Sequence, residues 1–75
     1  MTEYIQYGID TIRKRIMEEI SKALDRVVDL SIKKVYKENK NIVVEGKYET
    51  YFFNEKGDFK IVFDEYLNLV NFEVT

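Results

Sequence analysis

The sequence contains no histidine, cysteine, proline or tryptophan among its 75 residues. Without histidine it lacks the side chain that most often exchanges protons near neutral pH. Without cysteine it has no reactive thiol and no means of forming a disulfide, and the two commonest zinc ligands are both missing. Glycine occurs at Gly8, Gly46 and Gly57 alone, which excludes a glycine-rich phosphate-binding loop. We therefore predict no catalytic residues, no cofactor and no metal site, and expect that the protein is not an enzyme.

Long apolar runs and an excess of one charge are also missing. No stretch approaches the roughly 20 apolar residues that a membrane-spanning helix needs, and the opening Met1–Tyr4 has no basic segment of the kind that begins a signal peptide. Twelve basic and fourteen acidic side chains give a net charge of −2, which argues against a general electrostatic attraction to nucleic acid. We expect a cytoplasmic protein that does not contact membranes.

The composition that remains is that of a folded domain. Hydrophobic residues make up 45% of the chain and aromatic residues 15%, values too high for a disordered segment. A length of 75 residues suits one small domain. Such a chain buries only about 60% of the surface that its unfolded form exposes, so its stability depends on good packing.

The first third of the sequence has the periodicity of an amphipathic helix. Apolar residues recur every three or four positions, at Ile5, Ile9, Ile12, Ile16, Ile20, Leu24 and Val27. The pattern predicts a helix over about residues 3–27, with Gly8 as a weak point inside it. A later start, capped by Asp10, is the alternative. Opposite charges four residues apart explain the basic run Arg13–Arg15 as a solvated helix face.

After Leu30 the apolar residues alternate, as they do in strands with one buried face. Polar clusters at 38–41, 54–57 and 65–68 interrupt this alternation and are typical of turns. The pattern predicts four strands at about 29–37, 42–53, 58–64 and 69–75, joined by hairpins into an antiparallel meander. Together with the helix, this gives an α+β fold in two layers, with the helix on the apolar face of the sheet.

The expected strand registers bring the large apolar side chains to one face of the sheet. We expect the pairs Tyr36–Val44, Tyr48–Phe63, Phe63–Val70, Ile61–Phe72 and Phe59–Val74 on this face, with Asn41 in the left-handed conformation. Charged side chains then occupy the other face, where Lys47 lies opposite Asp64 and Lys60 opposite Glu73. Gly46, in the middle of a strand, indicates a bulge or a close approach of the helix.

Four aromatic residues are candidates for a partner-binding surface. Tyr51 and Phe53 fall on the otherwise charged face of the sheet, and Tyr4 and Tyr7 lie on first helical turns that extend beyond the sheet. Exposed aromatic side chains often mark interaction surfaces. The alternative is ordinary half-buried packing, because isolated exposed apolar residues are common in folded proteins.

The sequence from Ile42 to Val74 resembles a known class of small domain. Its segments Gly46–Glu49, Asn54–Gly57 and Phe63–Val70 resemble the strand–turn–strand pattern of PepSY-like domains. The order of one helix followed by a four-stranded meander is similar to the cystatin-like architecture. The resemblance implies a non-catalytic domain that binds or restrains a partner protein, and it carries no residue roles across.

We therefore predict a non-catalytic protein-binding or adaptor module, with a homodimer through the edge strand 69–75 as one form of it. That segment contains neither lysine nor proline to protect its edge. The alternative is a nucleic-acid-binding protein that uses Arg13, Lys14, Lys33, Lys34 and Lys37. A third hypothesis is a small ligand between the helix and the sheet.

Overall fold

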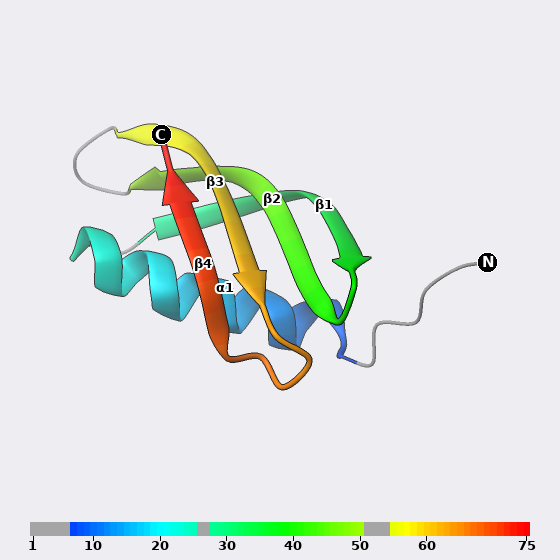
Figure 1. The fold of residues 1–75 in the computed structure, drawn as a ribbon. Helices are drawn as coiled ribbons and strands as arrows, with labels where there is room; N and C mark the ends of the chain where they lie inside the picture. Colours follow the sequence, from blue (N-terminus) through cyan, green and yellow to red (C-terminus); the bar gives the residue numbers. More distant parts are fainter. Residues whose placement is uncertain (1–6, 26–27, 51–54) are drawn as a thin grey trace.

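The computed structural model describes residues 7–25, 28–50 and 55–75. One helix packs against a four-stranded antiparallel sheet with the strand order β1-β2-β3-β4 (Figure 1). The predicted α+β fold in two layers is confirmed. The elements are α1 (Ile9–Leu24), β1 (Val28–Glu38), β2 (Asn41–Thr50), β3 (Lys56–Phe63) and β4 (Leu69–Val74).

The helix is shorter than predicted at its N-terminal end. Gly8 is the N-cap residue, with extended backbone angles, and its carbonyl accepts the hydrogen bond from the Ile12 N–H at 3.2 Å. Tyr7 and Gly8 therefore lie outside α1, and the predicted start near residue 3 is wrong for these two residues; residues 3–6 lie outside the described part of the chain. The physical reason is that glycine is about 1 kcal/mol less favourable than alanine inside a helix but is well accepted as an N-cap.

At its C-terminal end α1 stops at Leu24, before the predicted limit near residue 27. Asp25 adopts the left-handed conformation with φ 54°, and its N–H donates to the Ser21 carbonyl. A left-handed residue after the last turn is a common way to end a helix, because it satisfies a carbonyl that the helix leaves free. The chain is then turned back so that β1 begins at Val28.

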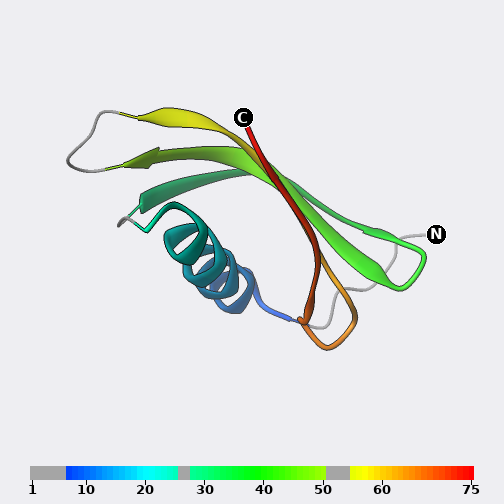
Figure 2. The ribbon, with the colours of Figure 1, turned by 60° about the vertical axis from the view of Figure 1, so that its left-hand side comes forward.

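The core lies between α1 and the inner face of the sheet. Ile12, Ile16 and Ile20, the centre of the predicted apolar stripe, are buried, whereas Ile9, also predicted in this stripe, is 54% exposed in the first turn of the helix. Figure 2 shows the sheet curving over the helix, which lies on the concave side. The loop before β4 contributes Leu67, and the sheet contributes the remaining buried residues of this cluster, namely Val28, Leu30, Ile42, Val44, Tyr48, Phe59, Ile61 and Phe63.

The register of β2 and β3 differs from the prediction. Tyr48 lies opposite Gly57, and Phe63 lies opposite Ile42 instead of Tyr48. The shift is an even number of residues, so the apolar side chains stay on the inner face. Gly57 belongs to β3 and not to a turn, and pairing continues to a hydrogen bond of 2.8 Å from the Thr50 N–H to the Glu55 carbonyl.

The two glycines of the sheet explain this register. Gly46 lies opposite Phe59, and Gly57 lies opposite Tyr48. Each aromatic ring lies over the facing glycine, in the space that a larger residue at the glycine position would occupy. A Cβ atom at Gly46 would lie 3.0 Å from two ring carbons of Phe59, and one at Gly57 would lie 3.0 Å from the ring of Tyr48. An aromatic ring over a strand glycine is a known device for fixing register. The close approach expected at Gly46 is thus made by Phe59 and not by the helix.

A bulge in β1 overturns the expected pairing of Tyr36 with Val44. The register shifts between Ile32 and Lys34, after which Val35 lies opposite Val44 and Tyr36 lies opposite Val43. The extra residue moves Val35 to the inner face and Tyr36 to the outer face. The hairpin closes through residues 39 and 40, and the left-handed residue is Asn39 (φ 59°) instead of Asn41.

The pairing of β3 with β4 follows the prediction over most of its length. Ile61 lies opposite Phe72 and Phe59 opposite Val74, as expected. At the loop end, Phe63 lies opposite Leu69 instead of Val70, because a register shift between Val62 and Phe63 leaves Val70 as the extra residue.

The outer face carries a ladder of alternating charges. Lys34, Glu45, Lys60 and Glu73 lie opposite one another across all four strands, which confirms the predicted Lys60–Glu73 pair. Lys47 lies opposite Asp58, at 3.6 Å between Nζ and Oδ1, instead of Asp64. Val43 lies on the same outer face, between Tyr36 of β1 and Val62 of β3, and its side chain is fully buried.

Candidate functional site

The structure places only one of the four candidate aromatic residues. Tyr4, Tyr51 and Phe53 lie outside the described residues. Tyr7 is half-buried against the core, and its hydroxyl donates a hydrogen bond of 2.8 Å to the Glu65 carbonyl. The expectation that Tyr7 is exposed on a projecting helical turn is therefore wrong, because its ring joins the chain before α1 to the loop before β4. A contact of Tyr7 with a partner stays a prediction.

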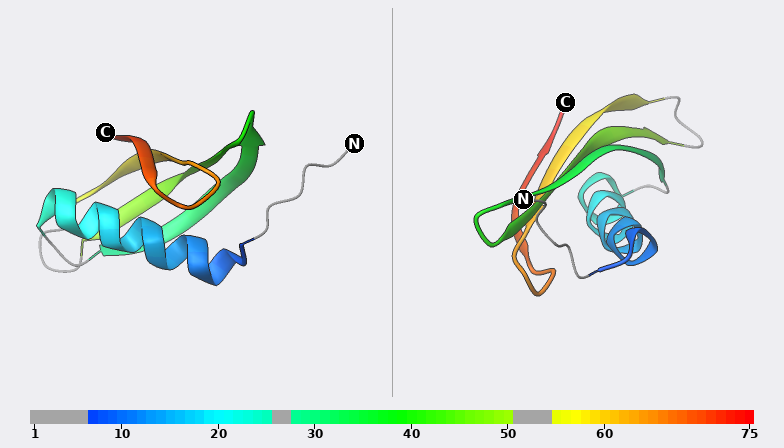
Figure 3. Two further views of the ribbon diagram at one scale, coloured as in Figure 1. Left: turned by 60° about the horizontal axis from the view of Figure 1, so that its bottom comes forward. Right: turned by 90° about the vertical axis from the view of Figure 1, so that its right-hand side faces the viewer.

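Four of the five large apolar side chains that are exposed among the described residues lie in β4 or in the loop before it; the fifth is Ile9, at the start of α1. Tyr66 is 72% exposed, Val70 54%, Leu69 42% and Val74 37%. We call these four residues the β4 surface. Figure 3 shows β4 at one edge of the sheet. The sequence had indicated the unprotected edge at 69–75, but Tyr66 was missed because it lies in a polar turn cluster.

The loop before β4 holds Tyr66 in its exposed position. The Asp64 carboxylate accepts hydrogen bonds from the backbone N–H groups of Tyr66 (2.8 Å) and Asn68 (2.9 Å), and from the Asn68 side chain (3.2 Å). Leu67 adopts a positive φ of 63° and turns its side chain into the core. Residues 66 and 67 thus point in opposite senses, which leaves the Tyr66 ring in solvent.

Arg15 of α1 contacts the same loop from the inner side of the sheet. The Arg15 Nε donates to the Leu67 carbonyl at 3.2 Å, and the guanidinium carbon lies 5.3 Å from the centre of the Phe63 ring. The Arg15 Nη1 is 2.6 Å from the Glu19 carboxylate, which fixes the guanidinium in place. A loop held at both ends in this way presents a preformed surface and not one that must order on binding.

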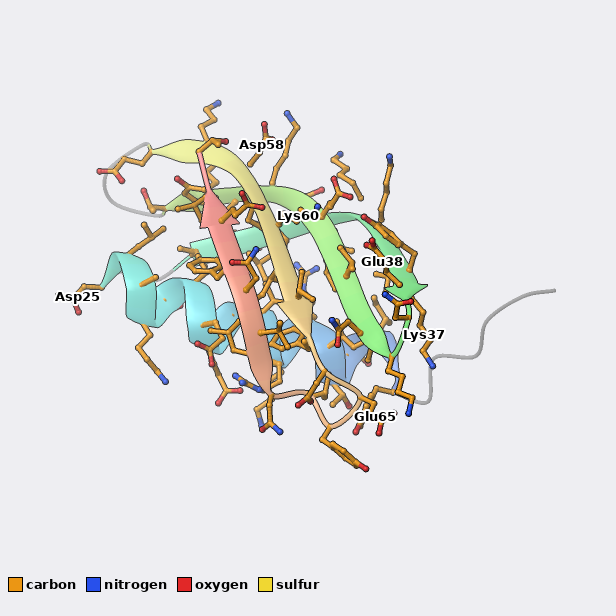
Figure 4. The ribbon with its side chains drawn as sticks, in the orientation of Figure 1. Asp25, Lys37, Glu38, Asp58, Lys60 and Glu65 are labelled. Atoms are coloured by element: carbon orange, nitrogen blue, oxygen red, sulfur yellow. The ribbon has the colours of Figure 1, made fainter. Side chains whose placement is uncertain are left out.

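The loop also shifts two pKa values. The hydrogen bonds to Asp64, first the one from the Asn68 N–H, outweigh desolvation and lower the pKa of its carboxyl below the ordinary 3.8. The pKa of Tyr66 is raised, first by its hydrogen bond to the Glu65 carboxylate and then by that negative charge. Figure 4 shows Glu65 in this loop.

The lowered pKa of Asp64 predicts an acid-sensitive loop. Because the pKa is lower in the folded than in the unfolded state, the ionised carboxylate stabilises the fold above pH 3.8, and this contribution is lost as the pH falls through the folded value. Asp64→Asn should therefore be less stable than the original protein at neutral pH, and the difference should shrink on acidification. Urea unfolding at a series of pH values measures this, and a difference independent of pH would contradict it.

The two edges of the sheet differ in their protection. The β1 edge carries Lys33, Lys34 and Lys37, and lysines on an edge strand discourage the addition of another strand. Both edge strands contain a register shift, so the lysines are what distinguishes the two edges. The β4 edge carries no lysine or proline from Leu69 to Thr75. The Thr75 N–H donates to the Asp58 carbonyl at 2.9 Å, so by alternation the backbone groups of Val74 and Phe72 point away from β3.

Two of the basic residues of the nucleic-acid hypothesis, Arg13 and Lys34, have neighbours of opposite charge within the chain. The Arg13 Nη2 donates to the Leu30 carbonyl at 2.7 Å and lies 3.7 Å from Asp29, so this guanidinium is held at the junction of α1 and β1. Lys34 lies opposite Glu45 in the charge ladder. Figure 4 shows Lys37 next to Glu38 at the far end of β1.

A hollow of about 380 Å³ lies over β1, β2 and β3. Its lining includes three acidic and two basic side chains, at Asp29, Lys47, Glu49, Lys56 and Asp58. Among residues 7–25, 28–50 and 55–75, no three acidic side chains lie close enough together to hold a metal ion. In the same part of the chain no helix has the length and apolar character that crossing a membrane requires.

Comparisons with known protein families, with curated proteins and with solved structures find no match for this chain. The resemblance to PepSY-like and cystatin-like domains therefore stays a prediction, and the candidate site is argued from the geometry of the chain alone.

Proposed function

We propose that this protein is a non-catalytic, cytoplasmic module that binds a partner protein through its β4 edge. The observation that supports this most strongly is the coincidence of two features on one strand. The exposed apolar side chains of the β4 surface lie beside backbone groups of Phe72 and Val74 that point away from the sheet. A partner strand added there gains main-chain hydrogen bonds and apolar contacts together.

The remainder of the surface supports the same proposal. On the outer face the charged residues Lys34, Glu45, Lys60 and Glu73 cross all four strands, and charged residues are depleted in the buried centre of protein interfaces. The missing histidine and cysteine support a non-catalytic role. Nucleic-acid binding through the basic residues of α1 and β1 is the alternative. It is supported less, because Lys34 lies opposite Glu45 and Arg13 is held by the Leu30 carbonyl and Asp29.

The proposal can be tested by site-specific photo-crosslinking in the native cells. A photoreactive phenylalanine analogue is placed at Val70, and in a matched variant at Lys34 on the opposite edge of the sheet. We expect protein adducts from position 70 and few from position 34, with the adduct identified by mass spectrometry.

Val74→Pro provides the control within the same experiment. The Val74 N–H points away from β3, so proline removes no hydrogen bond between β3 and β4 but blocks an incoming strand. Adducts from position 70 should disappear in this variant while its circular dichroism stays unchanged. No protein adduct from position 70, or adducts to nucleic acid from position 34, would overturn the proposal.

A further inference from the structure

We propose that the partner at the β4 edge is a second copy of this chain, paired antiparallel with β4 about a two-fold axis that passes through Phe72. This inference rests on the proposed function, since it names the occupant of the same edge. It predicts a continuous eight-stranded sheet that carries both helices on one face.

The backbone groups of β4 that point away from β3 support this pairing. The Thr75 N–H is directed toward Asp58 of β3, so the N–H and C=O groups of Phe72 and Val74 are directed outward. In an antiparallel pair centred on Phe72, the outward groups of Phe72 meet those of Phe72 in the second copy, and the two residues exchange two hydrogen bonds. The outward groups of Val74 then face the Val70 segment of the second copy.

The side chains also match in this register. Val74 lies opposite Val70 of the second copy in this register, and both side chains are exposed in the single chain. On the outer face Glu73 lies opposite Asn71, whose amide can donate to the carboxylate. The whole segment 69–75 takes part, because Phe72 is its central residue.

Neighbouring registers are less favourable. A pair centred on Asn71 sets Glu73 against Leu69, and a pair centred on Glu73 sets two carboxylates against each other. If the two-fold axis lies between two consecutive residues, inner-face side chains of one copy lie opposite outer-face side chains of the other. The β1 edge offers no comparable site because of its lysines.

Single cysteines test both the dimer and its register, since the chain has no cysteine of its own. Asn71→Cys and Glu73→Cys are prepared separately and oxidised with oxidised glutathione, alone and mixed. In the proposed register, positions 71 and 73 form a non-hydrogen-bonded pair with Cα atoms about 4.5 Å apart, and this spacing permits a disulfide. We expect the mixture to give at least about ten times more covalent dimer than either variant alone, in line with that geometric requirement.

Light scattering on the uncrosslinked protein supplies the second measurement. We expect a mass near twice 9.0 kDa at high micromolar concentration. Val74→Pro should weaken association at least about tenfold, because each copy loses an outward N–H group that can donate to the other copy. Lys34→Ala, at the other edge, should leave association unchanged.

The possible failures are distinct. A mass of 9.0 kDa at every concentration, or crosslinking of Asn71→Cys alone that equals the mixture, would overturn the proposed dimer. If position 70 then captures a different protein in cells, the binding function stands and only the identity of the partner is wrong. If position 70 captures no protein, both proposals fail.

Discussion

Phe63→Ala is expected to lower the free energy of unfolding by about 4 kcal/mol, in the range measured for deleting a buried aromatic ring. Phe63 is fully buried at the centre of the core, and its ring also supports the guanidinium of Arg15 at 5.3 Å. A chain of 75 residues has a total stability of about 4 to 11 kcal/mol. The expected loss is therefore at least about a third of the total stability.

Urea unfolding followed by circular dichroism measures the effect. Tyr66→Ala is the matched control, because that ring is 72% exposed and its removal should change stability by less than about 0.5 kcal/mol. Phe63→Leu keeps most of the volume and should cost less than about 1.5 kcal/mol, so it provides a folded comparison. A loss below about 1 kcal/mol for Phe63→Ala would contradict the described core.

Gly46→Ala is expected to have the second largest effect, a loss of about 2 to 3 kcal/mol, as overpacking of a filled space typically costs. The added Cβ would collide with the Ser31 carbonyl oxygen on the neighbouring strand and would lie 3.0 Å from two ring carbons of Phe59. A backbone atom of a paired strand cannot move aside without disturbing the ladder, so the substitution should strain β1, β2 and β3 together.

The same unfolding measurement checks this prediction. Gly8→Ala is the control, since a Cβ atom at Gly8 has nothing within 4 Å. Its cost should stay below about 1 kcal/mol, the difference between glycine and alanine as an N-cap. Equal losses for the two variants would show that the loss at Gly46 reflects intrinsic glycine preferences and not the close packing of Phe59.

The β4 surface was predictable in part. The unprotected edge at 69–75 was visible because lysine and proline are recognisable by type. Tyr66 was not, because its exposure depends on the positive φ of Leu67 and on the hydrogen bonds to Asp64, which form only when the loop closes. Tyr7 was misplaced for a similar reason, since its partner, the Glu65 carbonyl, is 58 positions away.

The sequence by itself determined the elements and their faces. Helical spacing selected Ile12, Ile16 and Ile20 as the buried stripe, and strict alternation selected the inner face of β3, because side-chain direction follows from local backbone geometry. The tertiary structure alone decided the registers. Alternation has a period of two, so it is compatible with any register shifted by an even number of residues. The register of β2 and β3 was selected by the fit of Phe59 over Gly46 and of Tyr48 over Gly57. In β1, the bulge before Lys34 placed Val35 on the inner face. Such contacts join residues distant in the chain, and no local pattern records them.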